Sequence, residues 1–410
     1  MDINKLLYRR QFILGSRFIN CFPHWKREKV DNDIFLTVHP DLPITKVASN
    51  KNSIIMLGYI LDPLNVSHDN FRILESIIAE IKSADDIFVK IARMCGRFVM
   101  IAKINNDFRI FNDTSGMRQI FYYKDTSNRL WCASQPSLIT EQFKLLPDKG
   151  IHDDLFKMSF FSTTSEYWYP GNSTIYKDIF HLTPNHYIDL DKLSIKRYWP
   201  TKRINAISIQ ECLKRNAFIL TSLLEAASER FSLALGISAG YDSRIVLAAS
   251  RKVSHKILYF THIPKNGDTT AFDVAIPTAL LKSLKLRHQL LITPDTMAPD
   301  FEQIFGKNVT TARTCKGLNV FALFEYFKSQ KNEIVLASGN ISEIAKRNVR
   351  RLARFPNKII NGYLLSLLAG MQSSRFARIK FREWFVCVKG LPRLGINLLD
   401  LFYWEQRMAN

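Results

Sequence analysis

The stretch LALGISAGYDSR, residues 233–244, passes from an apolar run through a turn of small polar residues into the helical pattern IVLAASRK. Ser238, Gly240 and Ser243 bring small side chains and backbone N–H groups to the start of that helix, where the dipole and the first N–H groups favour an anion. Asp242 in the same turn would repel a phosphate unless a divalent cation lay between them. The turn therefore predicts a site for a magnesium nucleotide, while helix capping by Ser238 and Asp242 is an equally good interpretation.

The residues around this turn predict a parallel sheet. SLALGI (232–237), HKILYFTHI (255–263) and LRHQLLITP (286–294) have the apolar runs of buried strands, and two helical patterns alternate with them. Alternation of this kind indicates a doubly wound α/β domain whose ligands bind beyond the carboxyl ends of the strands. Pro277 is expected to bend or split the second helix. The turn has neither a G-K-[ST] nor a G-x-G-x-x-G pattern, which excludes a Walker loop and a dinucleotide-binding loop.

The first two hundred residues follow a different pattern, with short strands predicted at 53–60, 97–104, 108–113, 119–124 and 129–134. Two amphipathic helices, 70–84 and 85–95, interrupt them and are expected to cover a sheet. Pro200 and the polar residues after it indicate a linker, followed by a helix at 208–231 with Ser208 as N-cap. We therefore predict two domains, residues 1–200 and 201–410.

Composition limits the partners and the compartment. The 410 residues include 57 Lys and Arg against 37 Asp and Glu, and this net charge of +20 favours anionic partners. The six cysteines form no C-x-x-C pair, so neither a zinc site nor a disulfide framework is indicated. Neither a signal-peptide core nor an uninterrupted apolar run of about 18 residues is present, so we expect a cytoplasmic protein without membrane insertion.

Several stretches resemble one family in the order in which they occur. SAGYDS (238–243) is similar to the S-G-G-x-D-S loop of the ATP-pyrophosphatases, or PP-loop enzymes, particularly the asparagine synthetase family. Residues 95–123, 130–139 and 173–191 resemble segments of the synthetases' amidotransferase domain. VLASGNISEIAKR (335–347) stands where the family has its second nucleotide loop, S-G-x-G-x-D-E.

The resemblance implies an α+β N-terminal sandwich of the Ntn-hydrolase type followed by an α/β PP-loop synthetase domain. It also implies that Mg-ATP adenylates a carboxylate, releasing pyrophosphate, and that an amine then displaces AMP. ATP and Mg²⁺ are the implied cofactors, with Asp242 and Glu343 as metal ligands. The implied ATP and pyrophosphate site comprises Ile237, Ser238, Ala239, Gly240, Tyr241, Asp242, Ser243, Phe260, Ser338 and Gly339.

The chain departs from the family at three places. Glutamine-dependent members carry a cysteine at the chain start, whereas Met1 is followed here by Asp2; the nearest cysteine, Cys21, is interpreted as a buried structural thiol. We therefore expect no glutaminase activity, as in the β-lactam synthetase and lasso-peptide cyclase branches. The acidic pair of the second loop becomes Ser342-Glu343, and Lys380 and Lys389 are available for the family's C-terminal lysine, although neither has a recognisable sequence context.

Two other functions stay open. One is a pseudoenzyme that binds ATP after losing the second acidic loop and the lysine. The other is a PP-loop enzyme that modifies RNA, which the positive charge would suit, although the amidotransferase-like half argues against it and nucleic acid is not an expected partner. The sequence identifies neither the carboxylate, nor the amine donor, nor the oligomeric state.

Overall fold

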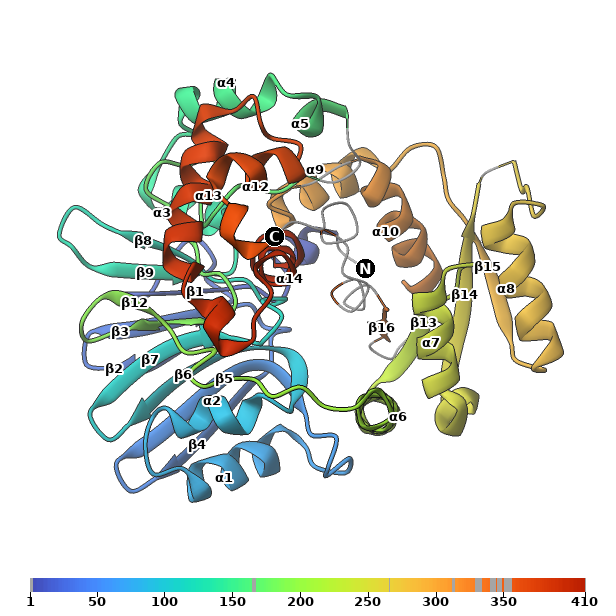
Figure 1. Cartoon of the computed structure of the whole chain (residues 1–410), viewed down its shortest axis with the longest axis horizontal. Coiled ribbons are helices and arrows are strands. Elements are labelled where there is room, and N and C mark those ends of the chain that lie inside the picture. Colours follow the sequence, from blue (N-terminus) through green and yellow to red (C-terminus); the bar gives the residue numbers. More distant parts are fainter. Residues whose placement is uncertain are drawn as a thin grey trace.

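The computed structural model describes residues 3–163, 167–264, 266–311, 314–328, 334–339, 344, 349 and 356–409. Two antiparallel sheets lie face to face in the N-terminal half (Figure 1), with strand orders β10-β8-β9-β1-β3-β2 and β12-β11-β7-β6-β5-β4. The first sheet consists of β1 (Phe12–Gly15), β2 (Lys26–Asp31), β3 (Ile34–Val38), β8 (Phe121–Lys124), β9 (Leu130–Ala133) and β10 (Phe180–His181). The second consists of β4 (Ile44–Ser49), β5 (Asn52–Leu61), β6 (Cys95–Ile104), β7 (Asp107–Asn112), β11 (His186–Asp189) and β12 (Ser194–Arg197).

Strand β6 shows why the second sheet is buried on both faces. Val99 and Ile101 belong to the core between the two sheets, while Phe98, Met100 and Ala102 belong to the core beneath the covering helices. Because successive side chains of a strand point to opposite faces, a nearly continuous apolar run is what such a strand requires. The run RFVMIAKI meets that requirement.

Helices cover both outer faces of the sandwich. On the second sheet these are α1 (Asn70–Glu80) and α2 (Asp86–Ile91), whose apolar residues join the core of that face, which confirms the two predicted amphipathic helices. On the first sheet, α3 (Pro136–Phe143) packs over a cluster that includes Trp131. The result is the layered α+β sandwich that the sequence predicts. The short helix η1 (Ile3–Leu6) precedes β1.

Cys21 is exposed rather than buried, so the prediction for this thiol is wrong. Ile19, Phe22 and Trp25 are the buried residues of this irregular segment. These larger apolar side chains fill the core positions, which leaves the intervening Cys21 toward solvent.

A parallel sheet of order β15-β14-β13-β16 forms the other half of the molecule, as the alternating pattern predicts. Its strands are β13 (Ser232–Gly236), β14 (Ile257–Ile263), β15 (His288–Ile292) and β16 (Ile334–Ala337). Its helices are α6 (Ile209–Arg230), α7 (Tyr241–Ala249), η2 (Arg251–Lys256), α8 (Phe272–Ser283), α9 (Pro299–Asn308) and α10 (Thr314–Phe327). Separate apolar clusters lie on the two faces of this sheet.

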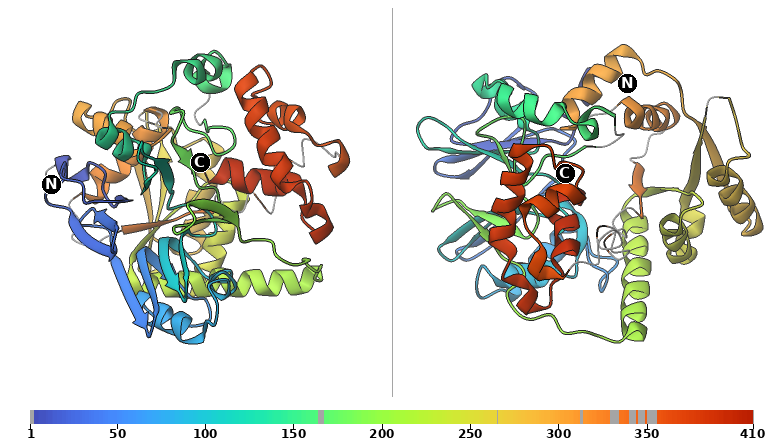
Figure 2. Two further views of the ribbon diagram at one scale, coloured as in Figure 1. Left: turned by 90° about the vertical axis from the view of Figure 1, so that its left-hand side faces the viewer. Right: turned by 45° about the horizontal axis from the view of Figure 1, so that its top comes forward.

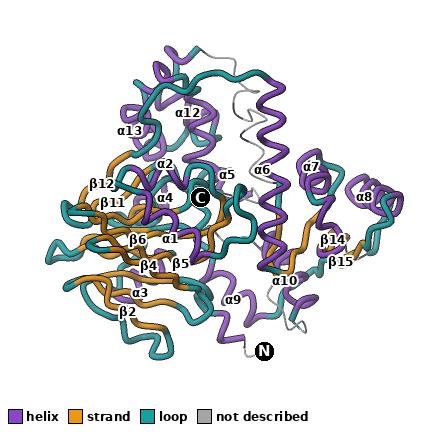
Figure 3. Tube along the Cα trace, turned by 90° about the horizontal axis from the view of Figure 1, so that it is seen from below, coloured by secondary structure: helices purple, strands orange, loops and turns teal. Residues whose placement is uncertain are grey.

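Helix α6 joins the two halves. The exposed segment 201–208 leads into it without regular structure, and the Ser208 hydroxyl accepts the Glu211 N–H at 3.1 Å, which confirms the predicted N-cap. The helix contacts both β5 of the sandwich and β13 of the parallel sheet. Figure 3 shows it between the sandwich and α7.

Helix α8 continues through Pro277, so the predicted split does not occur, while a bend at Pro277 stays a prediction. Proline removes a single N–H donor, the one that would reach the carbonyl of Asp273. The Thr278 hydroxyl adds a bond of 2.7 Å to the Val274 carbonyl beside that gap. None of the described helices combines the length and apolar character needed to cross a lipid bilayer.

The last helices pack against the sandwich side of the molecule (Figure 2). They are η4 (Asn357–Ile359), α12 (Gly362–Leu368), α13 (Arg375–Val388), η5 (Leu391–Leu394), α14 (Leu398–Phe402) and η6 (Tyr403–Met408). They share an apolar core with α4 (Lys149–Phe156) and α5 (Ser159–Thr163). Within this region the fully buried Glu405 carboxylate binds the Arg197 guanidinium through two bonds of 2.5 and 2.8 Å.

Candidate functional site

The strand order of the parallel sheet reverses at β13. The chain runs from β13 to β14 and β15 on one side, and then returns to place β16 on the other side. Leu235 is opposite Ala337, the last residue of β16, and Gly236 is opposite Phe260 of β14, so β14 and β16 flank the carboxyl end of β13. A crevice at the carboxyl ends of strands where the strand order reverses is the usual ligand position of such sheets.

The turn after β13 is held by its two serines. The Ser243 hydroxyl accepts the Ser238 N–H at 3.1 Å, and the Ser238 hydroxyl accepts the Gly240 N–H at 3.2 Å. The N-cap of α7 is Gly240, which supplies no side-chain capping bond. The interpretation of Ser238 or Asp242 as a simple cap of this helix is therefore wrong. Instead, the serines shape the turn, and Asp242 lies in the first turn of α7.

The second predicted loop meets the first at Asp242. A Cβ atom built on Gly339 would lie 2.8 Å from the carbonyl carbon and oxygen of Asp242 and 2.9 Å from its Cβ. Such approaches are well inside van der Waals contact, so the backbone after β16 packs directly on Asp242 and leaves no room for a side chain. Ser338 precedes this contact and is exposed. Glu343 lies outside the described residues.

Ile237 and Phe260 tie the turn to the neighbouring strand. The Ile237 N–H donates to the Phe260 carbonyl at 2.8 Å, and its carbonyl accepts the Thr261 hydroxyl at 2.7 Å. The Phe260 ring is buried with Ala234 and Leu291 on the face opposite α7. These two predicted site residues therefore hold the turn in place, and a nucleotide contact through them stays a prediction.

Asp273 is a neighbour of the turn that the sequence analysis missed. Its carboxylate accepts the Ala239 N–H at 3.0 Å from the first turn of α8. A carboxylate in this position makes the type of bond that a phosphate oxygen would make. An acidic residue at the start of the helix after the adjacent strand was the available signal. Tyr241 is 74% exposed, with the Arg244 guanidinium 4.6 Å from the centre of its ring.

The other groups expected at the nucleotide site, a set of metal ligands and a C-terminal lysine, do not gather at this edge among the described residues. Across the described part of the chain, no three His, Cys, Asp or Glu side chains lie together as metal ligands. Lys380 pairs with Glu383 at 2.9 Å on α13. Lys389 follows the same helix. Figure 1 shows α13 beside the sandwich, across the molecule from α7.

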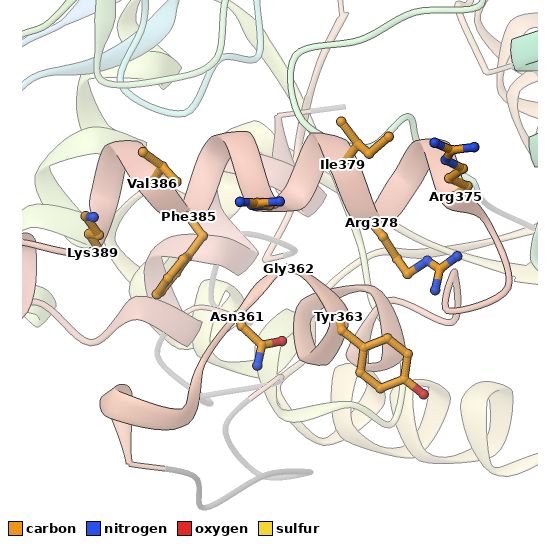
Figure 4. A pocket seen from close by; sticks show the side chains of 10 residues that line it. Asn361, Gly362, Tyr363, Arg375, Arg378, Ile379, Phe385, Val386 and Lys389 are labelled. Atoms are coloured by element: carbon orange, nitrogen blue, oxygen red, sulfur yellow. The ribbon is translucent and has the colours of Figure 1, made fainter.

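A groove of about 510 Å³ runs along α13 (Figure 4). Arg375, Arg378, Arg382 and Lys389 contribute its charges, and Tyr363 of α12 lies across from them. Helices α12 and α13 approach closely at Gly362, where a Cβ would lie 2.8 Å from the Arg378 carbonyl oxygen. Since this groove and the Asp242 turn lie on different parts of the molecule, its cations do not belong to the turn.

No protein-family model matches the sequence. A comparison with curated proteins likewise finds no match. Among solved structures, glutamine phosphoribosylpyrophosphate amidotransferase from B. subtilis, complexed with ADP and GMP, aligns at 10% identity over 72% of this chain and 71% of that one, with a TM-score of 0.28. A structure described as the allosteric regulatory enzyme of purine biosynthesis aligns at 10% identity over 82% and 86%, with a TM-score of 0.30. Scores this low assign no activity to this chain.

Proposed function

We propose that this protein is an ATP-dependent ligase related to the asparagine synthetases, which adenylates a carboxylate and transfers the acyl group to an amine. The observation that carries the proposal is the contact between Gly339 and Asp242 at the switch point of the parallel sheet. Two sequence stretches that resemble the family's nucleotide loops thereby lie against each other. In a fold of this class, that edge is where a nucleotide binds.

The proposed reaction has two steps. A carboxylate oxygen of the substrate attacks the α-phosphorus of ATP, and the bond to the β-phosphate oxygen breaks to release pyrophosphate. The amine nitrogen then attacks the acyl carbon, AMP leaves, and the amine loses a proton. Activation is needed because a carboxylate is a poor acyl donor until its oxygen becomes part of a phosphate leaving group.

The turn would contribute to the first step. N–H groups at the start of α7 and the hydroxyls of Ser238 and Ser243 would face the phosphate oxygens. Asp242 would hold Mg²⁺, which offsets the charge that develops on the departing pyrophosphate. The Ala239 N–H would exchange Asp273 for a phosphate oxygen. Glu343 is proposed as a further ligand of the metal.

Calorimetric titration with Mg-ATP, combined with ATP–pyrophosphate exchange over a panel of carboxylic acids, tests this proposal. We expect the wild type to bind Mg-ATP and to exchange label with one class of acid. Asp242→Ala should abolish exchange and weaken Mg-ATP binding at least about tenfold, since it removes the proposed metal ligand.

Asp268→Ala is the matched control. Asp268 is exposed in the loop between β14 and α8, and its carboxylate accepts the N–H and hydroxyl of Thr270. We expect this variant to bind Mg-ATP like the wild type. Equal affinity of the wild type and Asp242→Ala, or no binding at millimolar Mg-ATP, would overturn the proposal.

The position of the lysines favours a second candidate, a nucleotide-binding protein without adenylation. Lys380 is engaged by Glu383 on a helix that packs against the sandwich. If neither Lys380 nor Lys389 reaches the nucleotide, its pyrophosphate lacks this cationic partner. Binding of Mg-ATP without exchange for any acid, and with no loss on Lys380→Ala, would select this candidate.

A further inference from the structure

A second cavity, of about 820 Å³, lies between the sandwich and the parallel sheet. On one side it is lined by β5, β6 and the segments 9–11 and 116–119 of the sandwich. On the other side it is lined by Arg230 and Phe231, which precede β13, and by the first residues of β16. The cavity therefore adjoins the amino end of β13, whereas the Asp242 turn follows the carboxyl end.

The charges on the wall of this cavity have one sign. Its charged lining residues are Arg9, Arg10, Arg97, Arg118 and Arg230, and neither aspartate nor glutamate occurs among the described lining residues. Arg9 pairs with Asp41 at 2.7 Å on the surface. Arg230 donates to the Ile60 carbonyl and to the Asn70 side chain, both at 2.6 Å.

Arg118 is the most informative of these residues because only 8% of it is exposed. Its guanidinium donates to the carbonyls of Arg97 at 3.2 Å and Arg10 at 2.8 Å, and it forms no ion pair with a carboxylate of the described chain. Burial and the charge of Arg97 lower the pKa of Arg118 to about 9, although Asp113 acts in the opposite direction. A buried cation normally has an anionic partner.

Asp113 does not serve as that partner. Its carboxylate accepts the backbone N–H groups of Ser115, Met117 and Arg118, at 3.2, 3.1 and 2.9 Å. These bonds fix the turn that carries Arg118 into the cavity. The Arg118 guanidinium is thus held in place by carbonyl groups and by a rigid turn, while its charge is not neutralised through an ion pair within the described chain.

The backbone around Arg118 is shaped to admit the guanidinium. Gly58 has a φ of +108°, and a Cβ at this position would lie 2.1 Å from the Arg97 carbonyl oxygen and 3.0 Å from the Arg118 Nε. Only glycine combines that φ with such a close approach. The positive wall is therefore a built feature of the second sheet rather than a chance meeting of surface side chains.

We propose that this cavity binds a small anion with at least two negative charges, of the phosphate-ester or pyrophosphate type. Guanidinium groups bind phosphate oxygens through paired N–H donors, and two or more arginines on one wall match a multiply charged anion. An amino acid such as glutamine would bring an ammonium group, for which the described lining offers no carboxylate. Because the wall includes residues of both halves, the bound anion would connect the sandwich to the parallel sheet.

Inorganic pyrophosphate is the probe, titrated calorimetrically into the full-length protein with EDTA at constant ionic strength. EDTA excludes metal-dependent binding at the Asp242 turn. We expect Arg97→Gln to weaken pyrophosphate binding at least tenfold, because Arg97 is an exposed lining residue whose replacement should leave the fold intact. Arg118→Met is a second variant from the buried part of the wall and should show the same loss.

Two control variants separate this site from the rest of the molecule. Arg378→Gln changes the groove on α13, and Asp242→Ala changes the proposed nucleotide turn; both should bind pyrophosphate like the wild type. L-Glutamine should not displace the probe. Absence of binding in the wild type, unchanged affinity in Arg97→Gln, equal loss in Arg378→Gln, loss in Asp242→Ala, or displacement by glutamine would each overturn the proposal. None of these outcomes depends on ATP turnover.

Discussion

The two surfaces of the sandwich that contact the rest of the chain each contain a buried charge, but the charges are satisfied differently. Beside the C-terminal helices, Glu405 binds Arg197 and also accepts N–H bonds from Asn185 and Trp384, both at 2.9 Å. Toward the parallel sheet, the Arg118 guanidinium donates to two backbone carbonyls and pairs with no carboxylate of the described residues. The first contact is closed by an apolar core, whereas the second surrounds a cavity.

This difference gives the Glu405 ion pair a structural role and gives Arg118 the proposed role in binding. A buried ion pair whose polar atoms all have partners needs nothing from outside and fixes the packing of the helices around it. A buried cation beside a cavity, without a carboxylate partner in the described chain, can instead bind an anion that enters from solution.

Removing the Glu405 carboxylate should have the largest effect. We expect Glu405→Ala to lower the free energy of unfolding by about 3–5 kcal/mol, because it leaves the largely buried Arg197 charge without its carboxylate partner. Chemical denaturation measures this change. Glu383→Ala is the control, since Glu383 is 55% exposed in its ion pair with Lys380 and such a surface pair is worth less than about 1 kcal/mol. Equal losses in both variants would remove the contrast.

Acid should weaken the contact around Glu405 and leave the contact around Arg118 unchanged. Burial by itself raises the pKa of Glu405, but the hydrogen bond and charge of Arg197 outweigh burial and hold the pKa below its ordinary value. A depressed carboxyl pKa contributes stability that is present above the unfolded-state pKa and is lost as pH falls through the folded-state pKa. Glu405→Gln should therefore flatten the acid side of the stability profile, while Arg118→Met should leave that slope unchanged.

Gly58→Ala should strain the wall of the cavity that Arg97 and Arg118 line. The φ of +108° and the approach to the Arg97 carbonyl oxygen predict a loss of about 1–3 kcal/mol. Pyrophosphate affinity should fall as well, because the strand and the Arg118 guanidinium must separate. Gly390→Ala is a suitable control, with open space around the added methyl group. If Gly58→Ala were as stable as that control, the cavity wall would not depend on this close approach.

Arg118→Met should change stability by only about 1 kcal/mol, because the loss of two hydrogen bonds is partly offset by removal of a buried charge. Its stability should thus be far less affected than that of Glu405→Ala, although both remove a buried charged group. Denaturant unfolding of the two variants side by side measures the difference. A loss as large as that of Glu405→Ala would show that Arg118 already has a full counter-charge.

Asp273→Asn should have the smallest effect, and it concerns the opposite end of the parallel sheet. The carboxylate occupies the Ala239 N–H, so its neutralisation should strengthen Mg-ATP binding about threefold by reducing competition with phosphate oxygens. Calorimetry with Asp268→Asn as control measures this change. Weaker binding in Asp273→Asn would instead indicate that the carboxylate takes part in holding the metal.

Local sequence patterns predicted the helices and strands better than they predicted the contacts between them. The apolar run at 97–104 predicted strand β6, and Ser208 predicted the start of α6, because both signals depend on nearest neighbours. Pro277 does not split α8, because one missing N–H is a smaller effect than the packing of a complete helix. Cys21 was predicted to be buried, but larger apolar neighbours occupy the core positions of its segment.

The sequence by itself determined the alternation of strands and helices, the serine-rich turn at 238–243 and the excess of arginine, all of which follow from residue type and spacing. Only the tertiary structure decided that Gly339 lies on Asp242, that Asp273 reaches Ala239, and that Arg97, Arg118 and Arg230 share one cavity wall. These contacts join residues far apart in the chain. Such contacts depend on strand order and on how the two halves pack, which no local pattern encodes.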